Sequence, residues 1–191
     1  MATAGSSGQK RVAVFGGSFN PPHMGHVYVV AHVLATEPID EVWMVPTCKH
    51  PFGKKLAPYE ARYLMCGMVA DLFGERARVS DIEARIEGGA SWTVDTIARL
   101  MAENSQNSFA LVIGSDLVGE LDRWKEADRL REMVRLIVIN RAGAPAEGPG
   151  PQIPDVSSSW IRDRLRQGES VRGWVPQEVA EACEREGWFR Q

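Results

Sequence analysis

Short apolar runs that alternate with helical patterns are the feature that most constrains the fold of this chain. We expect buried strands at Val12–Phe15, Glu41–Val45, Phe109–Ile113 and Val134–Ile139. Between these runs, apolar residues recur at helical spacing in 27–36, 58–73 and 93–102. Alternation of this kind predicts βαβ units and a mostly parallel sheet, with ligands bound at the carboxyl ends of the strands.

The length of 191 residues favours one doubly wound, Rossmann-like α/β domain over residues 11–191. Helices expected at 160–166 and 176–185 make its C-terminal part helical. Residues 1–10 are small, polar and unpatterned, so we expect a disordered leader there. The stretch 141–155 is dense in proline and glycine, which predicts a surface loop.

Composition excludes several classes of protein. The 22 Lys and Arg residues are balanced by 25 Asp and Glu residues, which argues against a nucleic-acid partner. No apolar run approaches the ~18 residues of a membrane span, and no signal peptide is recognisable, so we expect a cytoplasmic protein without a membrane partner. The widely spaced Cys48, Cys66 and Cys183 suggest no disulfide framework. The sequence leaves open whether the chain forms a homo-oligomer.

The segment GGSFNPPHMGH, residues 16–26, lies directly between the first expected strand and the first expected helix. Gly16 and Gly17 allow the backbone to approach a phosphate closely, and a helix that begins near His26 offers unpaired N–H groups to an anion. His23 and His26 are three residues apart, so they share one side of a helical turn and can donate to a phosphoryl group that gains charge. The segment therefore predicts a phosphate-binding site in which neither histidine needs to act as a base.

Other interpretations of this segment fit less well. A zinc site lacks a carboxylate or cysteine that would complete the ligand set, so no protein-only metal site is expected. The G-x-G-x-x-G fingerprint and the G-x-x-x-x-G-K-[ST] loop are both absent. An isolated histidine is more often without function, and we interpret His32 in this way.

Residues 16–26 match the pattern G-G-[ST]-F-[ND]-P-x-H-x-G-H throughout, and on this segment the chain resembles the bacterial nicotinate mononucleotide adenylyltransferases of the H-x-G-H superfamily. Three further segments support the resemblance. SWTVDT at 91–96 is similar to the family's S-Y-T-x-D-T, with Trp92 in place of tyrosine. Gly114, Asp116 and Trp124 follow its G-x-D…W pattern, and VSSSWIR at 156–162 is similar to I-S-S-T-x-I-R.

The resemblance implies roles for individual residues. It makes His23 and His26 the catalytic pair. It assigns ATP binding to Gly16, Gly17, Ser18, Phe19, Gly114, Asp116, Ser157, Ser158 and Arg162. It assigns mononucleotide binding to Trp92, Thr93, Trp124, Thr47 and Lys54, and it implies Mg²⁺ as cofactor.

Simpler interpretations of some of these residues stay open. Asp116 would look the same as a helix N-cap, and the serines before Trp160 are good caps for the helix that follows. Trp124 could be an ordinary half-buried aromatic residue. The loop after the second strand departs from the family's P-P-H-[KR], so either Lys54 or Lys55 could reach the triphosphate, or both could be solvated.

The resemblance implies transfer of AMP from ATP to nicotinate mononucleotide, which yields nicotinate adenine dinucleotide and pyrophosphate. Within the superfamily, nicotinamide mononucleotide or phosphopantetheine are alternative acceptors. A regulatory module that binds nucleotide without turnover is an alternative of another class. A dinucleotide-binding oxidoreductase is disfavoured by the missing fingerprint.

Overall fold

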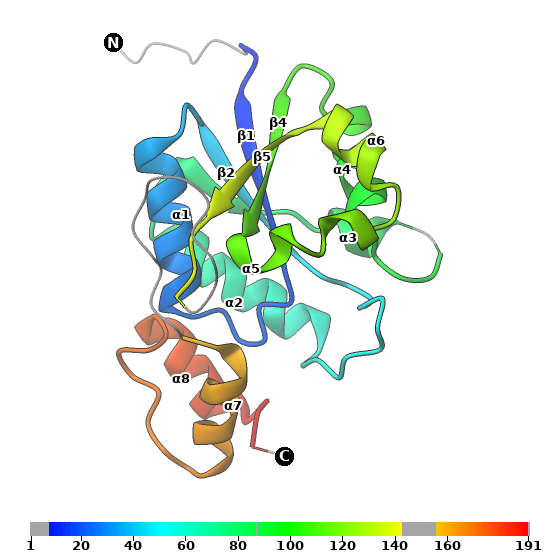
Figure 1. The fold of residues 1–191 in the computed structure, drawn as a ribbon. Helices are drawn as coiled ribbons and strands as arrows, with labels where there is room; N and C mark the ends of the chain where they lie inside the picture. Colours follow the sequence, from blue (N-terminus) through cyan, green and yellow to red (C-terminus); the bar gives the residue numbers. More distant parts are fainter. Residues whose placement is uncertain (1–7, 87, 143–155, 191) are drawn as a thin grey trace, which may run out of the picture.

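Five strands form one parallel sheet in the order β3-β2-β1-β4-β5 in the computed structural model, which describes residues 8–86, 88–142 and 156–190 (Figure 1). The strands are β1 (Arg11–Gly17), β2 (Glu41–Pro46), β3 (Ala77–Val79), β4 (Ser108–Gly114) and β5 (Arg135–Ile139). Every neighbouring pair is parallel, so the prediction of a doubly wound α/β sheet is confirmed. The sequence analysis missed β3, because three residues are too few to show a periodic pattern.

Helices connect the strands and cover both faces of the sheet. They are α1 (Met24–Thr36), α2 (Tyr59–Asp71), α3 (Ile82–Arg85), α4 (Thr93–Glu103), α5 (Ser115–Val118), α6 (Ala127–Met133), α7 (Ser158–Arg166) and α8 (Gln177–Glu186). Two 3₁₀ turns, η1 (Gly74–Arg76) and η2 (Leu121–Arg123), complete the connections. The long helices lie where the hydrophobic periodicity predicts them, whereas the short α3, α5 and α6 were not predicted.

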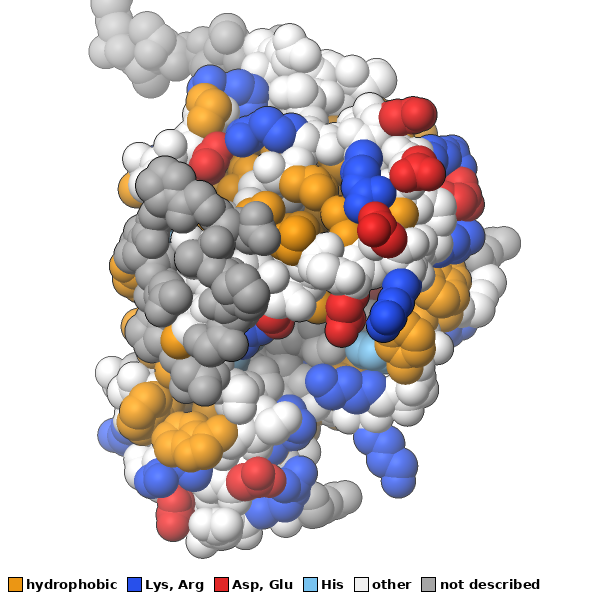
Figure 2. Space-filling model, viewed as in Figure 1, with side chains coloured by type: hydrophobic (Ala, Val, Ile, Leu, Met, Phe, Trp, Pro, Cys, Tyr) orange, Lys and Arg blue, Asp and Glu red, His pale blue; other side chains and the backbone are white. Residues whose placement is uncertain are grey.

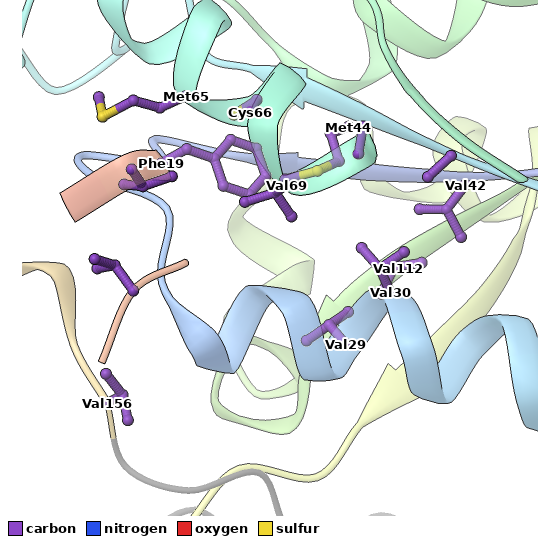
Figure 3. Packing of buried hydrophobic residues seen from close by; sticks show 14 of the residues in the cluster. Phe19, Val29, Val30, Val42, Met44, Met65, Cys66, Val69, Val112 and Val156 are labelled. Carbon is purple, nitrogen blue, oxygen red and sulfur yellow. The ribbon is translucent and has the colours of Figure 1, made fainter. Parts of the chain in front are cut away.

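The side chains of β1 alternate between two hydrophobic clusters, as the twofold period of a strand requires. Ala13 belongs to the cluster beneath α1 and α2, part of which is shown in Figure 3, and Val12 and Val14 belong to the cluster beneath α4 and α6. Because both faces are covered, the strand reads as a continuous apolar run. Since helices cover both faces, a ligand is expected to bind beyond the carboxyl ends of the strands.

The two C-terminal helices pack beyond that edge, next to the beginning of α1 (Figure 1). Cys183 of α8 lies against Met65 of α2, with the two sulfur atoms 3.8 Å apart. The Met24 N–H donates to the Trp174 carbonyl at 2.9 Å, which joins α1 to the turn before α8. These contacts place the start of α7 beside the glycine–histidine segment.

The fold is already ordered at Lys10, which the sequence analysis assigned to the leader. Its carbonyl accepts the Ser108 N–H at 2.9 Å, and its ammonium forms an ion pair with Glu41. Residues 1–7 of the expected leader lie outside the described residues, and so does most of the expected loop, 143–155. Among the helices of the described residues, none has the length and hydropathy to cross a membrane. On the face shown in Figure 2, basic and acidic side chains are interspersed.

Candidate active site

A cavity of about 620 Å³ opens at the carboxyl edge of the sheet, where β1 and β4 end. It brings together residues that the sequence analysis found in distant segments. The predicted site residues that line it are Gly16, Gly17, Ser18, His23, His26, Thr47, Trp92, Thr93, Gly114, Asp116 and Trp124. Five of the predicted site residues do not line this cavity, namely Phe19, Lys54, Ser157, Ser158 and Arg162.

The two histidines lie in contact at the start of α1. The backbone N–H of His23 donates to Nδ1 of His26 at 3.0 Å, and the ring centroids are 3.8 Å apart. Because Nδ1 of a neutral His26 is the acceptor in this bond, its ring proton resides on Nε2. Nδ1 of His23 is buried and has no hydrogen-bond partner among the described residues. A buried polar atom of this kind is available to a ligand.

Burial keeps both histidines neutral at pH 7. It lowers the pKa of His23 from 6.5 to about 4, and the nearby positive charge of Arg141 contributes to the same shift. Burial also lowers the pKa of His26 well below its ordinary value, with further contributions from His23 and Arg141. The pair can therefore offer neutral N–H donors to a phosphate.

Two glycines and a buried phenylalanine shape the cavity next to the histidine pair. A Cβ at Gly16 would meet no atom within 4 Å, whereas a Cβ at Gly17 would lie 3.2 Å from Cζ of Phe19. Phe19 has a φ of 43° and is 1% exposed, within the cluster of Figure 3. Its ring centroid lies 4.9 Å from that of His26. The side chain of Phe19, which we predicted to bind ATP, thus supports His26 from the core.

An aspartate–arginine pair lies near the histidines, with Asp116 in α5 and Arg141 just after β5. Arg141 Nη1 lies 3.1 Å from Oδ2 of Asp116, and both residues line the cavity. A Cβ at Gly114 would lie 2.2 Å from Oδ1 of Asp116, so this carboxylate position requires glycine there. The N-cap of α5 is Gly114, and the N-cap interpretation of Asp116 is therefore wrong. The sequence analysis missed Arg141, although its position directly after an expected strand was a usable signal.

The start of α7 is bonded to the glycine–histidine segment. Ser157 is the N-cap and accepts the Trp160 N–H at 3.2 Å, as the capping interpretation predicts. The Ser158 hydroxyl donates to the Pro21 carbonyl at 2.9 Å. Arg162 Nη1 donates to the Asn20 carbonyl at 2.7 Å. These bonds hold a guanidinium and a helix N-terminus next to the segment that carries the histidines.

The other end of the cavity is walled by two indoles. Trp92 is the N-cap of α4, Thr93 is its first residue, and Trp124 follows η2. The N–H of Thr47 donates to the Gly17 carbonyl at 2.9 Å, which connects this end to the glycines. Lys54 is exposed and outside the cavity, whereas Lys125, which was not predicted, lines it.

A carboxylate that the sequence analysis also missed lies at this end. Glu83 of α3 lines the cavity and accepts the Cys48 N–H at 2.9 Å. No sequence signal would have selected it, because nothing in the surrounding sequence distinguishes it from an acidic residue on an exposed helix.

The chain matches known proteins along most of its length. The family described as cytidylyltransferase-like matches residues 14–164. A probable nicotinate-nucleotide adenylyltransferase of Anaeromyxobacter sp. (strain K) is 40% identical over 96% of this chain and 99% of the relative. A probable nicotinate-nucleotide adenylyltransferase of Myxococcus xanthus is 42% identical over 87% of each chain.

Solved structures support the fold. The Plasmodium falciparum nicotinic acid mononucleotide adenylyltransferase complexed with NaAD has a TM-score of 0.80, at 19% identity, over 95% of this chain and 98% of the other. A similarity at this level of identity supports the fold alone. The sequence identity with the relatives extends over nearly the full chain and shows the family. This chain belongs to the nicotinate-nucleotide adenylyltransferase family.

Proposed function

We propose that this chain transfers AMP from ATP to nicotinate mononucleotide and releases pyrophosphate. The observation that carries the proposal is a single cavity with two chemically distinct ends. One end presents Gly16, His23 and His26 to phosphates, and the other presents Trp92 and Trp124 to an aromatic ring. The phosphates of two substrates can meet between these ends, which is the arrangement that joining two nucleotides requires.

The reaction is a direct displacement at phosphorus. An oxygen of the acceptor's 5′-phosphate bonds to the α-phosphorus of ATP, and the bond from that phosphorus to the bridging oxygen of the β-phosphate breaks. The electron pair leaves with pyrophosphate. Because the acceptor phosphate is anionic at neutral pH, the site needs alignment and charge stabilisation rather than a general base.

The histidines supply donors where charge develops. A neutral His26 carries its proton on Nε2, since Nδ1 accepts the His23 N–H. His23 contributes a ring whose Nδ1 has no protein partner among the described residues. Donors that are already oriented in a buried site stabilise the transition state without the cost of reorganising solvent.

The triphosphate is held by backbone and by cations. The N-terminus of α1 and the backbone at Gly16 and Gly17 offer N–H groups to it. Arg162 donates to the Asn20 carbonyl of this segment, and Arg141, which lines the cavity, pairs with Asp116. Both guanidinium groups can exchange a protein acceptor for a phosphate oxygen.

Mg²⁺ fits the donor set as an ion bound mainly by the substrate. The described residues contain no cluster of three or more His, Cys, Asp or Glu side chains that could hold a metal ion, while Asp116 places one carboxylate on the cavity wall. Mg²⁺ commonly binds through one or two carboxylates, waters and substrate phosphates. When bound with ATP, it would neutralise phosphate charge next to Asp116.

The first turn of α4 favours nicotinate over nicotinamide as the acceptor base. Thr93 begins this helix and lines the cavity, as do Trp92 and Trp124. The positive end of a helix dipole and its unpaired N–H groups stabilise a carboxylate more than a neutral amide. Trp92 and Trp124 offer surfaces on which a pyridine ring can stack.

Pyrophosphate release by purified protein with ATP and Mg²⁺ tests the proposal. Nicotinate mononucleotide, nicotinamide mononucleotide and phosphopantetheine are compared as acceptors at equal concentration. We expect a clear preference for nicotinate mononucleotide. Preference for another acceptor would overturn the assignment of the pyridine pocket, and ATP binding without pyrophosphate release from any acceptor would favour the regulatory module.

A further inference from the structure

Glu83 lies where three separate segments of the chain meet. It lines the main cavity and also a smaller one of about 250 Å³ on the far side of Ser91 and Trp92. Its Oε2 accepts the Cys48 N–H at 2.9 Å, and its Oε1 accepts the Thr96 hydroxyl at 3.2 Å. The Ser91 hydroxyl is a further hydrogen-bond partner of the same carboxylate. One side chain thus holds the turn after β2, the segment before α4 and the first turn of α4.

These partners belong directly to the walls of the acceptor end. Lys49 and Ser91 are joined twice, by the Ser91 N–H to the Lys49 carbonyl at 2.9 Å and by the Lys49 N–H to Ser91 Oγ at 3.1 Å. The Thr96 hydroxyl is also within 3.2 Å of the Trp92 carbonyl. The carboxylate therefore acts together with the Lys49–Ser91 pair in joining the Thr47 wall to the Trp92–Thr93 wall.

The electrostatic setting of Glu83 is unfavourable for a group that only stabilises the fold. Burial raises its pKa above the ordinary value, while its hydrogen bonds and the positive charge of Arg62 oppose that shift. Since burial is the largest of these influences, the carboxylate costs free energy at this position, and an apolar residue of similar volume would avoid that cost. What an apolar residue cannot do is accept hydrogen bonds from Cys48, Ser91 and Thr96 together.

We propose that Glu83 is a positioning residue that sets the width of the mononucleotide pocket by holding the Cys48 turn against the start of α4. The inference rests on the proposed function, because it concerns the acceptor of that reaction. Glu83 acts through Trp92 and Thr93 and does not touch the reacting phosphates. Its loss should weaken acceptor binding and leave ATP binding and the chemical step nearly unchanged.

Steady-state kinetics of Glu83→Ala and Glu83→Gln test this inference. Glu83→Ala removes the acceptor that three donors share, and we expect the KM for nicotinate mononucleotide to rise about tenfold. Glu83→Gln keeps one acceptor oxygen, and we expect a rise of about threefold. For both variants the KM for ATP should stay within about twofold and kcat within about threefold of wild type. The graded response of the two variants is itself part of the expectation.

Two further variants sharpen the test. Thr96→Val removes one donor to the carboxylate at constant shape, and we expect a smaller rise in the acceptor KM than Glu83→Ala causes. Glu103→Ala is the matched control, because it deletes a carboxylate at the other end of α4 that pairs with Arg85 and Arg99 outside the cavity. Its kcat and its KM values for nicotinate mononucleotide and for ATP should match those of wild type.

Specific outcomes would overturn the inference. A fall in kcat at unchanged KM would make Glu83 a catalytic residue, and equal rises in both KM values would make it a general scaffold residue. If Glu83→Ala does not fold, Glu83→Gln carries the test, with calorimetric titration of nicotinate mononucleotide as a readout independent of turnover. Wild type that releases no pyrophosphate with nicotinate mononucleotide contradicts the proposed function, whereas active wild type with unaltered Glu83 variants contradicts only this inference.

Discussion

The phosphate end and the acceptor end of the cavity are built in different ways. At the end that the proposed function gives to phosphate, the glycines and both histidines come from one continuous segment, in which the N–H of His23 bonds to His26 and the ring of Phe19 packs against His26. The acceptor end is assembled from Thr47, Glu83, Trp92 and Trp124, which belong to four separate parts of the chain.

Because of this difference, we expect the phosphate end to control the chemical step and the acceptor end to control binding of the mononucleotide. Short-range bonds orient the phosphate donors before any substrate binds, which suits a group that stabilises a transition state. The acceptor end depends on how distant segments pack, so its width can change without disturbing the chemistry. Substitutions at the phosphate end should therefore lower kcat or weaken ATP binding, and substitutions at the acceptor end should raise the KM of the mononucleotide.

The largest expected effect belongs to His26→Ala. Loss of one preorganised donor should lower kcat by about 10² to 10³, with the acceptor KM little changed. Initial rates of pyrophosphate release measure this. His32→Ala is the matched control, because His32 lies on the same helix outside the cavity and should retain wild-type kcat. Turnover of His26→Ala close to that of wild type would contradict the role of the phosphate end.

Burial of the histidines should also make the fold sensitive to acid. Since the pKa of His23 is about 4 in the folded protein and 6.5 ordinarily, the unfolded state takes up a proton first as the pH falls. Stability is complete above pH 6.5 and decreases as the pH falls to about 4, by about 3 kcal/mol at most for this group.

Urea unfolding of wild type and His23→Asn across this range measures the effect. The difference between the two curves reports on His23 and on its contribution to the lowered pKa of His26, because the other groups titrate in both proteins. Wild type should lose more free energy of unfolding than His23→Asn between pH 6.5 and 4. Parallel curves would show that His23 titrates alike in the folded and unfolded states.

Gly16→Ala should weaken ATP binding while the fold is preserved. A Cβ at Gly16 meets no protein atom within 4 Å, so the methyl group would occupy space that the proposed function gives to phosphate. We expect the KM for ATP to rise about tenfold with the free energy of unfolding unchanged.

Gly67→Ala controls for the glycine substitution itself. Gly67 lies in α2, and a Cβ there also meets no atom within 4 Å. Chemical denaturation should show a gain of about 0.5–1 kcal/mol from helix propensity. Its KM for ATP should be that of wild type. If Gly16→Ala binds ATP as tightly as Gly67→Ala does, the backbone at Gly16 is not a phosphate contact.

Trp124→Ala is expected to have the smallest effect and to act at the other end. Loss of one stacking surface should raise the acceptor KM about three- to tenfold and leave the KM for ATP unchanged. Trp174→Ala removes an indole that lies outside the cavity, and all of its constants should match wild type. A change in the KM for ATP instead would reverse the assignment of the two ends.

Much of this molecule could be predicted from the sequence because its signals are local. Strands buried on both faces read as apolar runs, long helices show their period, and the segment 16–26 carries its chemistry in consecutive residues. The short β3, α3 and α5 were missed for the converse reason, since three or four residues show no period.

The assignment of roles within the site depended on tertiary structure. The motif placed Phe19 with the ATP-binding residues, but its side chain packs in the core under His26. Arg141 reaches Asp116 only because β5 pairs with β4, and Lys54 stays outside the cavity because the loop that carries it is exposed.

The sequence by itself determined the parallel α/β fold and the family, and it predicted a phosphate-binding segment, because each depends on hydrophobic periodicity or on neighbours along the chain. Tertiary structure alone decided that Glu83 and Arg141 join the site and that Phe19 supports it from behind. Hydrogen bonds such as that from Cys48 to Glu83 join residues far apart in sequence, and their formation depends on how the helices pack against the sheet.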